Sequence, residues 1–258
     1  MTARPIFRRL LWAHRWAAQF FDPIRAFHSL RGLPHFFSDW RRYSQLPNAE
    51  GIRFGDSQPQ LHDRSGATPF DPHYFYVSGW AMRRIVAHRP RRHVDVGSHN
   101  LFANLLSAVV PVTFLDYRPL NARLAGLECV GGDILKLPFA DRSADSLSCL
   151  HVAEHIGLGR YGDPLDPEGT QKAARELVRV LAPGGNLYFA LPVGRPRVCF
   201  NAHRVHGPEA IREFFCGLEL VEFSGVHDDG RFVEKIELNE FKESDYACGM
   251  FLFRNRRS

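Results

Sequence analysis

Residues 132–156 read GDILKLPFADRSADSLSCLHVAEHI, and this stretch decides the fold. The run ADSLSCLH at 144–151 has the length and the flanking turn residues of a buried strand. Asp133 follows a pair of glycines near the start of the stretch, and His151 is the last residue of the predicted strand. In an open α/β sheet, ligands bind beyond the carboxyl ends of the strands. The stretch therefore predicts a strand that ends at a ligand site.

Strands and helices alternate on both sides of this stretch. The helix expected at about 168–182 has apolar residues on one face and closes on Pro183-Gly184-Gly185, a strong stop signal. Repeated strand-then-helix units predict a doubly wound α/β fold, Rossmann-like, with a seven-stranded, mostly parallel sheet and helices on both faces. The predicted strands are 93–96, 112–116, one from 128, 144–151, 186–192, 219–225 and 248–254, and the predicted helices are 74–88, 100–110, 168–182 and 208–217.

The basic character of the chain lies in its first part. Residues 1–42 hold eight Arg and two Asp, a balance of +6, so the rest of the chain carries −1 of the net charge of +5. Phe, Leu and Trp stand beside these charges, which favours a peripheral contact with an anionic membrane surface. A solvated helical face has the same composition, so both alternatives stay open. The chain carries no strong signal for nucleic-acid binding.

Proline residues divide this first part. We expect two short amphipathic helices, at about 6–20 and 35–45, with breaks at Pro23 and Pro34. The stretch 46–72 is rich in Pro, Gly, Ser, Asp and Gln, which indicates an irregular connection. The predicted organisation is a basic helical extension with its connection at 1–72, followed by an α/β domain at 73–258.

Composition excludes several classes of protein. Hydrophobic content of 45% and charged content of 24% are ordinary for a globular domain. No run approaches the eighteen or so uncharged apolar residues of a membrane-spanning helix, and the start lacks the pattern of a signal peptide. We expect a cytoplasmic protein, peripheral to the membrane if the basic arm binds lipid. The cysteines are odd in number and form no CxxC pair, which favours free thiols: Cys129, Cys149, Cys199, Cys216 and Cys248.

Polar residues follow the predicted strands at the edge where a ligand would bind. Gly97 opens a turn after the first strand, but His99 stands where a GxGxxG pattern would have its second glycine. Asp116 ends the second strand about 20 residues later, where a carboxylate can accept both hydroxyls of an adenosine ribose. Asp133 follows the third strand and can accept from an adenine amino group, with Ile134 beside the ring. Each Asp alone could be a turn residue, but acids on successive strand ends favour a nucleoside site.

Four segments in this order resemble class I S-adenosylmethionine (SAM)-dependent methyltransferases. They are VDVGS (94–98), FLDY (114–117), the stretch 132–156 and ELVRVLAPGGNLYFALP (176–192). The resemblance spans about 92–225. A longer set of segments resembles an uncharacterised branch of that superfamily, known only as a domain of unknown function: HVAEHIGLGRYGDPLDPEG (151–169), FNAHRVH (200–206) and HYFYVSGWAMRRI (73–85).

The resemblance implies SAM as the cofactor. An aromatic face such as that of Tyr74 or Tyr76 would suit its sulfonium cation, although aromatic residues before a sheet are more often packing residues. The departure at His99 leaves the pose of the cofactor open. The implied cofactor-binding residues are Asp95 and Gly97 at the methionine end, Asp116 at the ribose, Asp133 and Ile134 at the adenine, and His151 beneath the cofactor.

His151, Glu154 and His155 form an H-x-x-E-H set whose members would share one face if a helix began there. His203 or His206 could complete the cluster, and we give His203 more weight. Similar E-x-x-E-H clusters bind a divalent ion in small-RNA end-methylating and some quinone-ring methyltransferases, although His replaces the first Glu here. Bound Mg²⁺ or Mn²⁺ on His151, Glu154, His155 and His203 is one interpretation, and packing at a helix start is the other. The candidate catalytic residues are His151, His155 and His203, because a histidine can remove the proton of a hydroxyl acceptor.

Three functions compete for this sequence. The first is SAM-dependent methylation of a hydroxyl group on a small molecule or saccharide. The second is a binding or scaffold protein that keeps the methyltransferase fold without turnover. The third, a nicotinamide-dependent dehydrogenase, is weakened by the missing GxGxxG.

Overall fold

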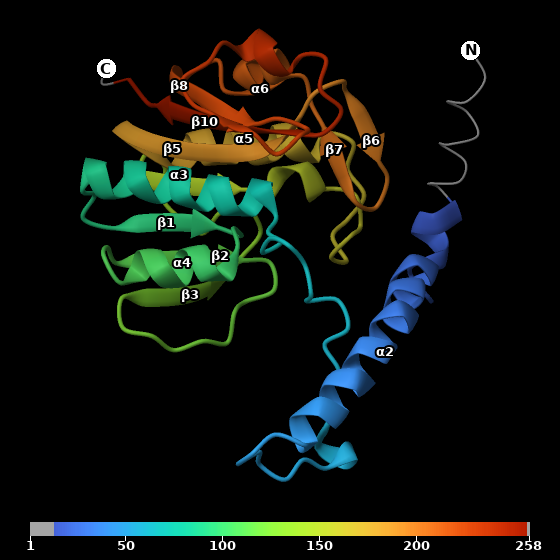
Figure 1. Ribbon diagram of the computed structural model, residues 1–258. Coiled ribbons are helices and arrows are strands. Elements are labelled where there is room, and N and C mark those ends of the chain that lie inside the picture. The colour runs from blue at the N-terminus through green and yellow to red at the C-terminus, as the bar shows by residue number, and fades with distance from the viewer. Residues whose placement is uncertain (1–12, 257–258) are drawn as a thin grey trace, which may run out of the picture. The chain divides into compact units, whose positions relative to one another are not determined.

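The computed structural model describes residues 13–256 of the chain (Figure 1). These residues form two compact units, and the division falls between Pro69 and Phe70. The α/β sheet lies entirely in the second unit.

The first unit is built around one long helix, α2 (Pro23–Ser44). Asp22 caps its start, because the Asp22 carboxylate accepts the N–H groups of Ile24 and Arg25, both at 3.0 Å. Residues 13–17 are also helical, and a 3₁₀ turn, η1 (Phe54–Asp56), follows α2. No side chain of α2 is fully buried. Within the described residues, no helix is both long and apolar enough to cross a membrane.

The predicted break at Pro34 is wrong, whereas a break does lie before Pro23, because residues 18–22 are not helical. Pro23 is the first residue of α2, where the N–H group that proline lacks would have no partner within the helix. Pro34 lies inside α2 and removes one backbone hydrogen bond, to the carbonyl of Leu30, without ending the helix. The helix predicted at 35–45 is therefore the second half of α2. Residues 6–12 of the other predicted helix lie outside the described part of the chain.

The second unit contains a sheet with the strand order β3-β2-β1-β4-β5-β10-β8-β9. The strands from β3 to β5 are parallel, β10 is antiparallel to both β5 and β8, and β9 is antiparallel to β8. The order reverses between β1 and β4, so the topological switch point lies there. The strands are β1 (His93–Val96), β2 (Val112–Asp116), β3 (Leu127–Gly131), β4 (Ala144–Leu150), β5 (Leu181–Val193), β8 (Glu219–Val226), β9 (Phe232–Val233) and β10 (Ala247–Arg254).

Helices cover both faces of this sheet (Figure 1). Successive strand residues point to opposite faces, so Tyr188 packs with Trp80 and Phe102 on one side, and Phe189 packs with Leu177 and Ile211 on the other. The first face is covered by α3 and α4, and the second by α5 and α6. The helices are α3 (Pro72–His88), α4 (Asn100–Ser107), α5 (Gly169–Val180) and α6 (Pro208–Phe214), with 3₁₀ turns η2 (Ala153–His155) and η3 (Leu238–Phe241).

The prediction of a doubly wound, mostly parallel α/β fold is confirmed. The main sheet has eight strands rather than seven in the described residues, because the two residues of β9 pair with the edge of β8. A separate hairpin of β6 (Arg197–Cys199) and β7 (His203–Val205) was not predicted either.

The segment Pro183-Gly184-Gly185 does not end a helix. The helix α5 stops at Val180, and β5 begins at the next residue and includes the segment. The pairing of β5 with β4 shifts register here, from Ala144–Leu181 to Ser146–Asn186. A side chain on Gly185 would meet the carbonyl oxygens of both Ala144 and Asp145 within about 3.1 Å. The glycines therefore let β5 bulge against β4 instead of stopping the preceding helix.

Candidate active site

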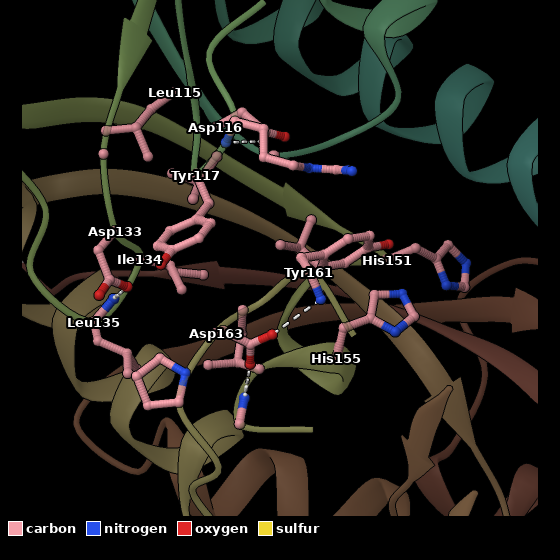
Figure 2. Close-up of a pocket in the computed structure, with 18 residues that line it drawn as sticks. Leu115, Asp116, Tyr117, Asp133, Ile134, Leu135, His151, His155, Tyr161 and Asp163 are labelled. Atoms are coloured by element: carbon pink, nitrogen blue, oxygen red, sulfur yellow. Dashed lines mark hydrogen bonds between the residues drawn. The ribbon is translucent and has the colours of Figure 1, made fainter. Parts of the chain in front are cut away.

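A cleft opens at the carboxyl ends of the parallel strands, at the switch point of the sheet (Figure 2). It encloses about 830 Å³, including the solvent space at its mouth. Gly97 after β1, Asp116 at the end of β2, Asp133 and Ile134 after β3, and His151 after β4 all line it. These are the residues predicted to bind the cofactor, with Asp95 as the exception.

Two glycines make room in the wall of this cleft. Gly97 has a φ of +67°, a conformation that other residues rarely adopt, and a side chain on it would lie 3.1 Å from Val152. A side chain on Gly132 would lie 2.7 Å from Leu115. The backbone can therefore approach a ligand at both turns.

The two strand-end acids are held by their own turns. The Asp116 carboxylate accepts the N–H of Arg118 at 2.8 Å, and the Asp133 carboxylate accepts the N–H of Leu135 at 2.8 Å. These are the local bonds of an Asx turn, which fix the direction of each carboxylate. Figure 2 shows both side chains on neighbouring strand ends at the edge of the cleft.

Asp95 supports the cleft from below rather than lining it. Its side chain is fully buried, accepts the N–H of Ser98 at 3.2 Å and accepts the Ser148 hydroxyl. Burial raises the pKa of Asp95 to about 6, although the bonds from Ser148 and Ser98 act in the opposite direction. The residue thus fixes the turn that begins at Gly97.

Sequence reasoning gave no role to the loop that closes the far side of the cleft. Tyr161 and Asp163 belong to this loop and line the cleft (Figure 2). The Arg118 guanidinium lies 4.4 Å from the centre of the Tyr161 ring. Asp163 holds the loop by accepting the N–H groups of Gly157, at 2.7 Å, and of Tyr161, at 3.2 Å. The run GLGRYGDP (157–164) has no periodicity that would mark its tyrosine as a residue of the cleft.

A second cavity adjoins the cleft, and His151 and His155 line both. Tyr74 packs against His151 with ring centres 5.3 Å apart, whereas Tyr76 stacks on Phe232 at 4.9 Å and belongs to the packing of the domain. The other residues that line the second cavity are Asp71, Pro72, His73, Tyr74, Glu154, Arg160, His203 and Tyr246.

Glu154 is the buried centre of the predicted H-x-x-E-H set. The chain forms the 3₁₀ turn η2 here, not an α-helix, and His151 has a φ of +57°. Even so, Glu154 Oε1 lies 3.1 Å from His151 Nδ1 and 3.6 Å from His155 Nε2. The other oxygen, Oε2, is buried without a hydrogen-bond partner. Burial opposes ionisation of Glu154, but the two imidazoles hold its pKa below the ordinary value.

His151 carries the opposite shift. Burial disfavours the imidazolium form, but the Cys248 sulfur and the Glu154 carboxylate outweigh it and raise the pKa of His151 above its ordinary value. A buried, perturbed acid–base pair of this kind, in a conformation with positive φ, is typical of a functional site.

The β6–β7 hairpin brings the distant histidine to this cavity. His155 Nδ1 lies 2.6 Å from the carbonyl oxygen of Ala202 and 3.2 Å from Arg160 Nη1. The carbonyl oxygen can only accept, and its shorter distance favours a proton on this nitrogen. Arg160 donates to the same carbonyl at 3.1 Å. His203, the next residue, lines the cavity with its ring 4.9 Å from that of Tyr246, and burial lowers its pKa.

His206 points elsewhere. Its Nε2 atom lies 3.3 Å from the Thr170 hydroxyl, and burial lowers its pKa to about 4. His203, which we favoured over His206, is therefore the distant histidine that lines the second cavity.

Ligand atoms for a metal converge in a different combination from the predicted one. Within residues 13–256, His73, His151 and Cys248 place one ligand atom each within 4.8 Å of one another. Glu154 lies behind His151 as its hydrogen-bond partner. The set of His151, Glu154, His155 and His203 stays a prediction.

Comparisons with known proteins place the fold. A family model described as "Caenorhabditis protein of unknown function, DUF268" matches residues 139–251. Many solved structures are similar to the chain, and two of them serve as examples. One is the N-methyltransferase NodS from Bradyrhizobium japonicum in complex with S-adenosyl-L-homocysteine, with 18% identity, 84% of this chain and 97% of that chain covered and a TM-score of 0.53. The other is YcgJ from Bacillus subtilis, with 12% identity, coverage of 71% and 100% and a TM-score of 0.51. The search of curated proteins gives no significant match.

The strand order, the strand-end cleft and these likenesses define the class. The chain has the fold of class I SAM-dependent methyltransferases. Within that class it resembles the uncharacterised branch through residues 139–251.

Proposed function

We propose that the chain is a SAM-dependent methyltransferase that methylates a hydroxyl group of a small molecule or saccharide. The observation that carries this proposal is the wall shared by the two cavities, which His151 and His155 form. A cofactor in the strand-end cleft and an acceptor in the second cavity would meet at this wall. Holding both partners in place removes much of the entropic cost of their reaction.

The residues of the strand-end cleft fit SAM. Asp116 would accept the ribose hydroxyls and Asp133 the adenine amino group, while Ile134 and Leu115 offer apolar surface to the adenine ring. Gly97 leaves the backbone open to the methionine end. When bound, SAM supplies an electrophilic methyl group on a sulfonium cation.

The second cavity offers groups that can take a proton from a hydroxyl. A neutral alcohol is a poor nucleophile, so its proton must leave as the oxygen attacks. The lowered pKa of His203 keeps this imidazole neutral near pH 7, ready to accept a proton. The bond from His155 Nδ1 to Ala202 leaves Nε2 as the nitrogen that can exchange one.

The lining of this cavity also supports a hydroxyl-rich acceptor. Tyr74 and Tyr246 present partly exposed rings, and Arg160 offers a hydrogen-bond donor. Flat rings interleaved with a few polar groups suit a small polyhydroxylated ligand.

A divalent ion is the alternative way to activate the hydroxyl, since it would lower the pKa of a bound alcohol. If the chain uses Mg²⁺ or Mn²⁺, the ion would be bound by His151, Glu154, His155 and His203. A chelator should then abolish activity, and added Mg²⁺ or Mn²⁺ should restore it. If a histidine acts alone as the base, the chelator has no effect.

A non-catalytic scaffold is the competing function, since the fold does not guarantee turnover. The test uses the purified full-length chain. We expect calorimetry to show binding of SAM and not of NADH, and label from methyl-labelled SAM to enter a hydroxyl-bearing fraction of a cell extract. In the variant Asp116→Ala, SAM binding is expected to weaken roughly 10- to 100-fold and label transfer to fall with it. SAM binding without any label transfer would favour the scaffold, and tight NADH binding would exclude this class.

We propose in addition that α2 contacts an anionic membrane surface. Its exposed side chains include Phe27, Leu30 and Phe37, each at least half exposed, and they alternate with Arg25 and Arg31. Apolar side chains interleaved with arginine are typical of a helix that lies in the membrane interface.

A further inference from the structure

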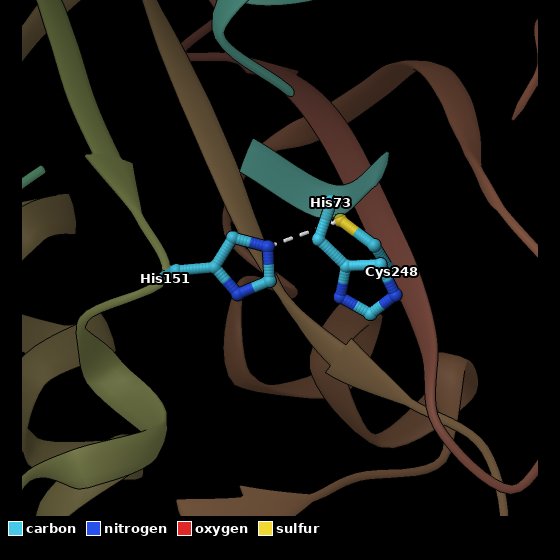
Figure 3. A group of neighbouring side chains, drawn as sticks. All are labelled: His73, His151 and Cys248. Carbon is cyan, nitrogen blue, oxygen red and sulfur yellow. Dashed lines mark hydrogen bonds between the residues drawn. The ribbon is translucent and has the colours of Figure 1, made fainter. Parts of the chain in front are cut away.

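Three side chains from distant parts of the sequence meet beside the second cavity (Figure 3). His73 lies in the first turn of α3, His151 follows β4, and Cys248 lies near the start of β10. Each offers one ligand atom, and the three atoms lie within 4.8 Å of one another. Two of the three positions belong to rigid elements of the domain, which is where precise ligand sites are best built.

The closest pair is spaced as two ligands of one ion. His151 Nε2 lies 3.3 Å from Cys248 Sγ. On a tetrahedral Zn²⁺, a nitrogen at about 2.0 Å and a sulfur at about 2.3 Å lie about 3.5 Å apart. An ion can therefore bind both atoms with only a small movement of the side chains.

Glu154 orients His151 in the way that metal-ligating histidines are oriented. Glu154 Oε1 accepts from His151 Nδ1 at 3.1 Å, which leaves the opposite nitrogen, Nε2, directed at the Cys248 sulfur. A carboxylate behind a histidine is the usual partner of a zinc-bound imidazole, because it fixes the ring and makes it a stronger donor.

The site can also be reached by an ion. Cys248 is fully buried, but His73 and His151 line the second cavity, which opens to solvent. The carboxylates of Asp71, Asp228 and Glu154 act on His73 electrostatically and would favour a cation, but burial and the neighbouring His151 outweigh them and lower the pKa of His73 to about 4.

We propose that His73, His151 and Cys248 bind one zinc ion, with the fourth coordination position facing the second cavity. One thiolate and two imidazoles form a borderline-soft donor set, which selects Zn²⁺ over the oxygen-preferring Mg²⁺ and Mn²⁺. Three protein ligands and one open position are the arrangement of zinc sites that bind a substrate or water. Ion binding at this site stands whether or not the chain transfers a methyl group.

The first experiment uses the full-length chain after chelator treatment. We expect about one Zn²⁺ per chain by calorimetry and metal analysis, with Mg²⁺ unable to displace it. We expect Co²⁺ to bind in its place and to give the thiolate-to-cobalt charge-transfer absorption of a cysteine ligand. Absence of stoichiometric Zn²⁺ binding, or a cobalt spectrum without that absorption, overturns the proposal.

Variants then assign the ligands. Cys248→Ser should remove the charge-transfer absorption, His73→Gln should weaken Zn²⁺ binding at least tenfold, and Glu154→Gln should weaken it by roughly 10- to 100-fold. Cys129→Ser, a thiol on β3 away from the cluster, should leave the spectrum and the affinity unchanged. Circular dichroism checks that each variant is folded. If Cys248→Ser does not fold, the charge-transfer absorption of the cobalt-loaded wild type tests whether a thiolate binds the ion. An unchanged spectrum in folded Cys248→Ser, or unchanged Zn²⁺ affinity in His73→Gln, overturns the ligand assignment.

Discussion

The Nε2 atom of His93 lies 2.8 Å from the Ser148 hydroxyl oxygen, inside the parallel sheet. That hydroxyl in turn donates to the Asp95 carboxylate, and His93 Nδ1 lies 2.7 Å from the Ser146 hydroxyl. A buried chain of hydrogen bonds therefore connects β1 and β4 beneath the candidate cofactor cleft. Burial shifts both titratable members toward their neutral forms, lowering the pKa of His93 to about 3 and raising that of Asp95 to about 6.

These shifts predict a dependence of stability on pH. Because the pKa of Asp95 is higher in the folded chain than its ordinary value of 3.8, its contribution to the free energy of unfolding is present below pH 3.8 and is lost as the pH rises through 6. The stability of Asp95→Asn relative to the wild type should therefore increase by about 3 kcal/mol between about pH 4 and pH 8, at about 1.4 kcal/mol per pKa unit. Urea denaturation at several pH values measures this difference.

The matched variant is His93→Gln, which should show the opposite trend. The pKa of His93 is lower in the folded chain than its ordinary value of 6.5, so the wild type loses stability as the pH falls from 6.5 toward 3. The variant lacks this loss and should gain stability relative to the wild type at acidic pH. Parallel curves for wild type and both variants would show that the buried chain does not titrate as described.

Asp116→Ala should weaken SAM binding by about 1.5–3 kcal/mol, or roughly 10- to 100-fold, which is the scale of hydrogen bonds to a charged group. The reason is that its carboxylate stands at the end of β2 in the cleft, held by the N–H of Arg118. Calorimetry with SAM measures the change. Asp229→Ala, which removes an exposed carboxylate that does not line the cleft, serves as the control. Equal affinity in Asp116→Ala and the wild type would move the ribose site elsewhere.

Gly97→Ala should destabilise the turn at the cleft. The φ of +67° costs a residue with a side chain about 1–2 kcal/mol, and the added carbon would lie 3.1 Å from Val152. We expect a lower free energy of unfolding and weaker SAM binding. Gly217→Ala is the control, since a side chain there would meet nothing within 4 Å. If both variants unfold at the same urea concentration, the turn at Gly97 tolerates a side chain and does not require glycine.

The sequence was sufficient for most of the fold because its strands are short apolar runs bounded by turn residues. The predicted strands 93–96 and 112–116 have the observed bounds. The stops predicted at Pro34 and at Pro183-Gly184-Gly185 are wrong, because local rules treat these residues as helix breakers. In the folded chain the neighbouring turns of α2 and the pairing of β5 with β4 carry the backbone through them.

The residues of the candidate site could likewise be predicted only in part from the sequence. Asp116 and Asp133 could be predicted because strand ends of a parallel sheet meet at one edge. The approach of Cys248 to His73 and His151 could not, because these residues come from three elements far apart in the chain and no spacing links them. Tyr161 was missed because its glycine-rich loop has no periodicity, so only the folded chain shows which way its ring lies.

The full-length chain should sediment with vesicles of anionic lipid at low salt and not with neutral vesicles. Exposed apolar side chains around the start of α2, such as Phe20 at 89% exposure and Phe27 at 55%, would enter the interface while the arginines attract the lipid headgroups. Replacing both phenylalanines with serine should abolish sedimentation, and Arg25→Gln with Arg31→Gln should shift it to lower salt. If the wild type does not sediment at low salt, the exposed side of α2 is a solvated helical face and not a membrane contact.

The last prediction concerns the histidines of the second cavity. If His203 or His155 removes the acceptor proton, replacing that residue with alanine should lower the rate of methyl transfer by about 10²–10⁴-fold, with SAM affinity unchanged. The SAM affinity is the control for folding and for the cofactor cleft, and His206→Ala is the matched variant, because His206 bonds Thr170 instead of lining this cavity.

The pH profile separates a base from a packing residue. A neutral imidazole is required, so the rate should fall as the pH drops through the pKa of the base, and the lowered pKa of His203 places that fall below the ordinary value of 6.5. Loss of this acidic limb in His203→Ala assigns the base to His203, and its loss in His155→Ala assigns it to His155. Full activity in both variants would mean that the proton leaves by another group and that these histidines only pack the hairpin against η2.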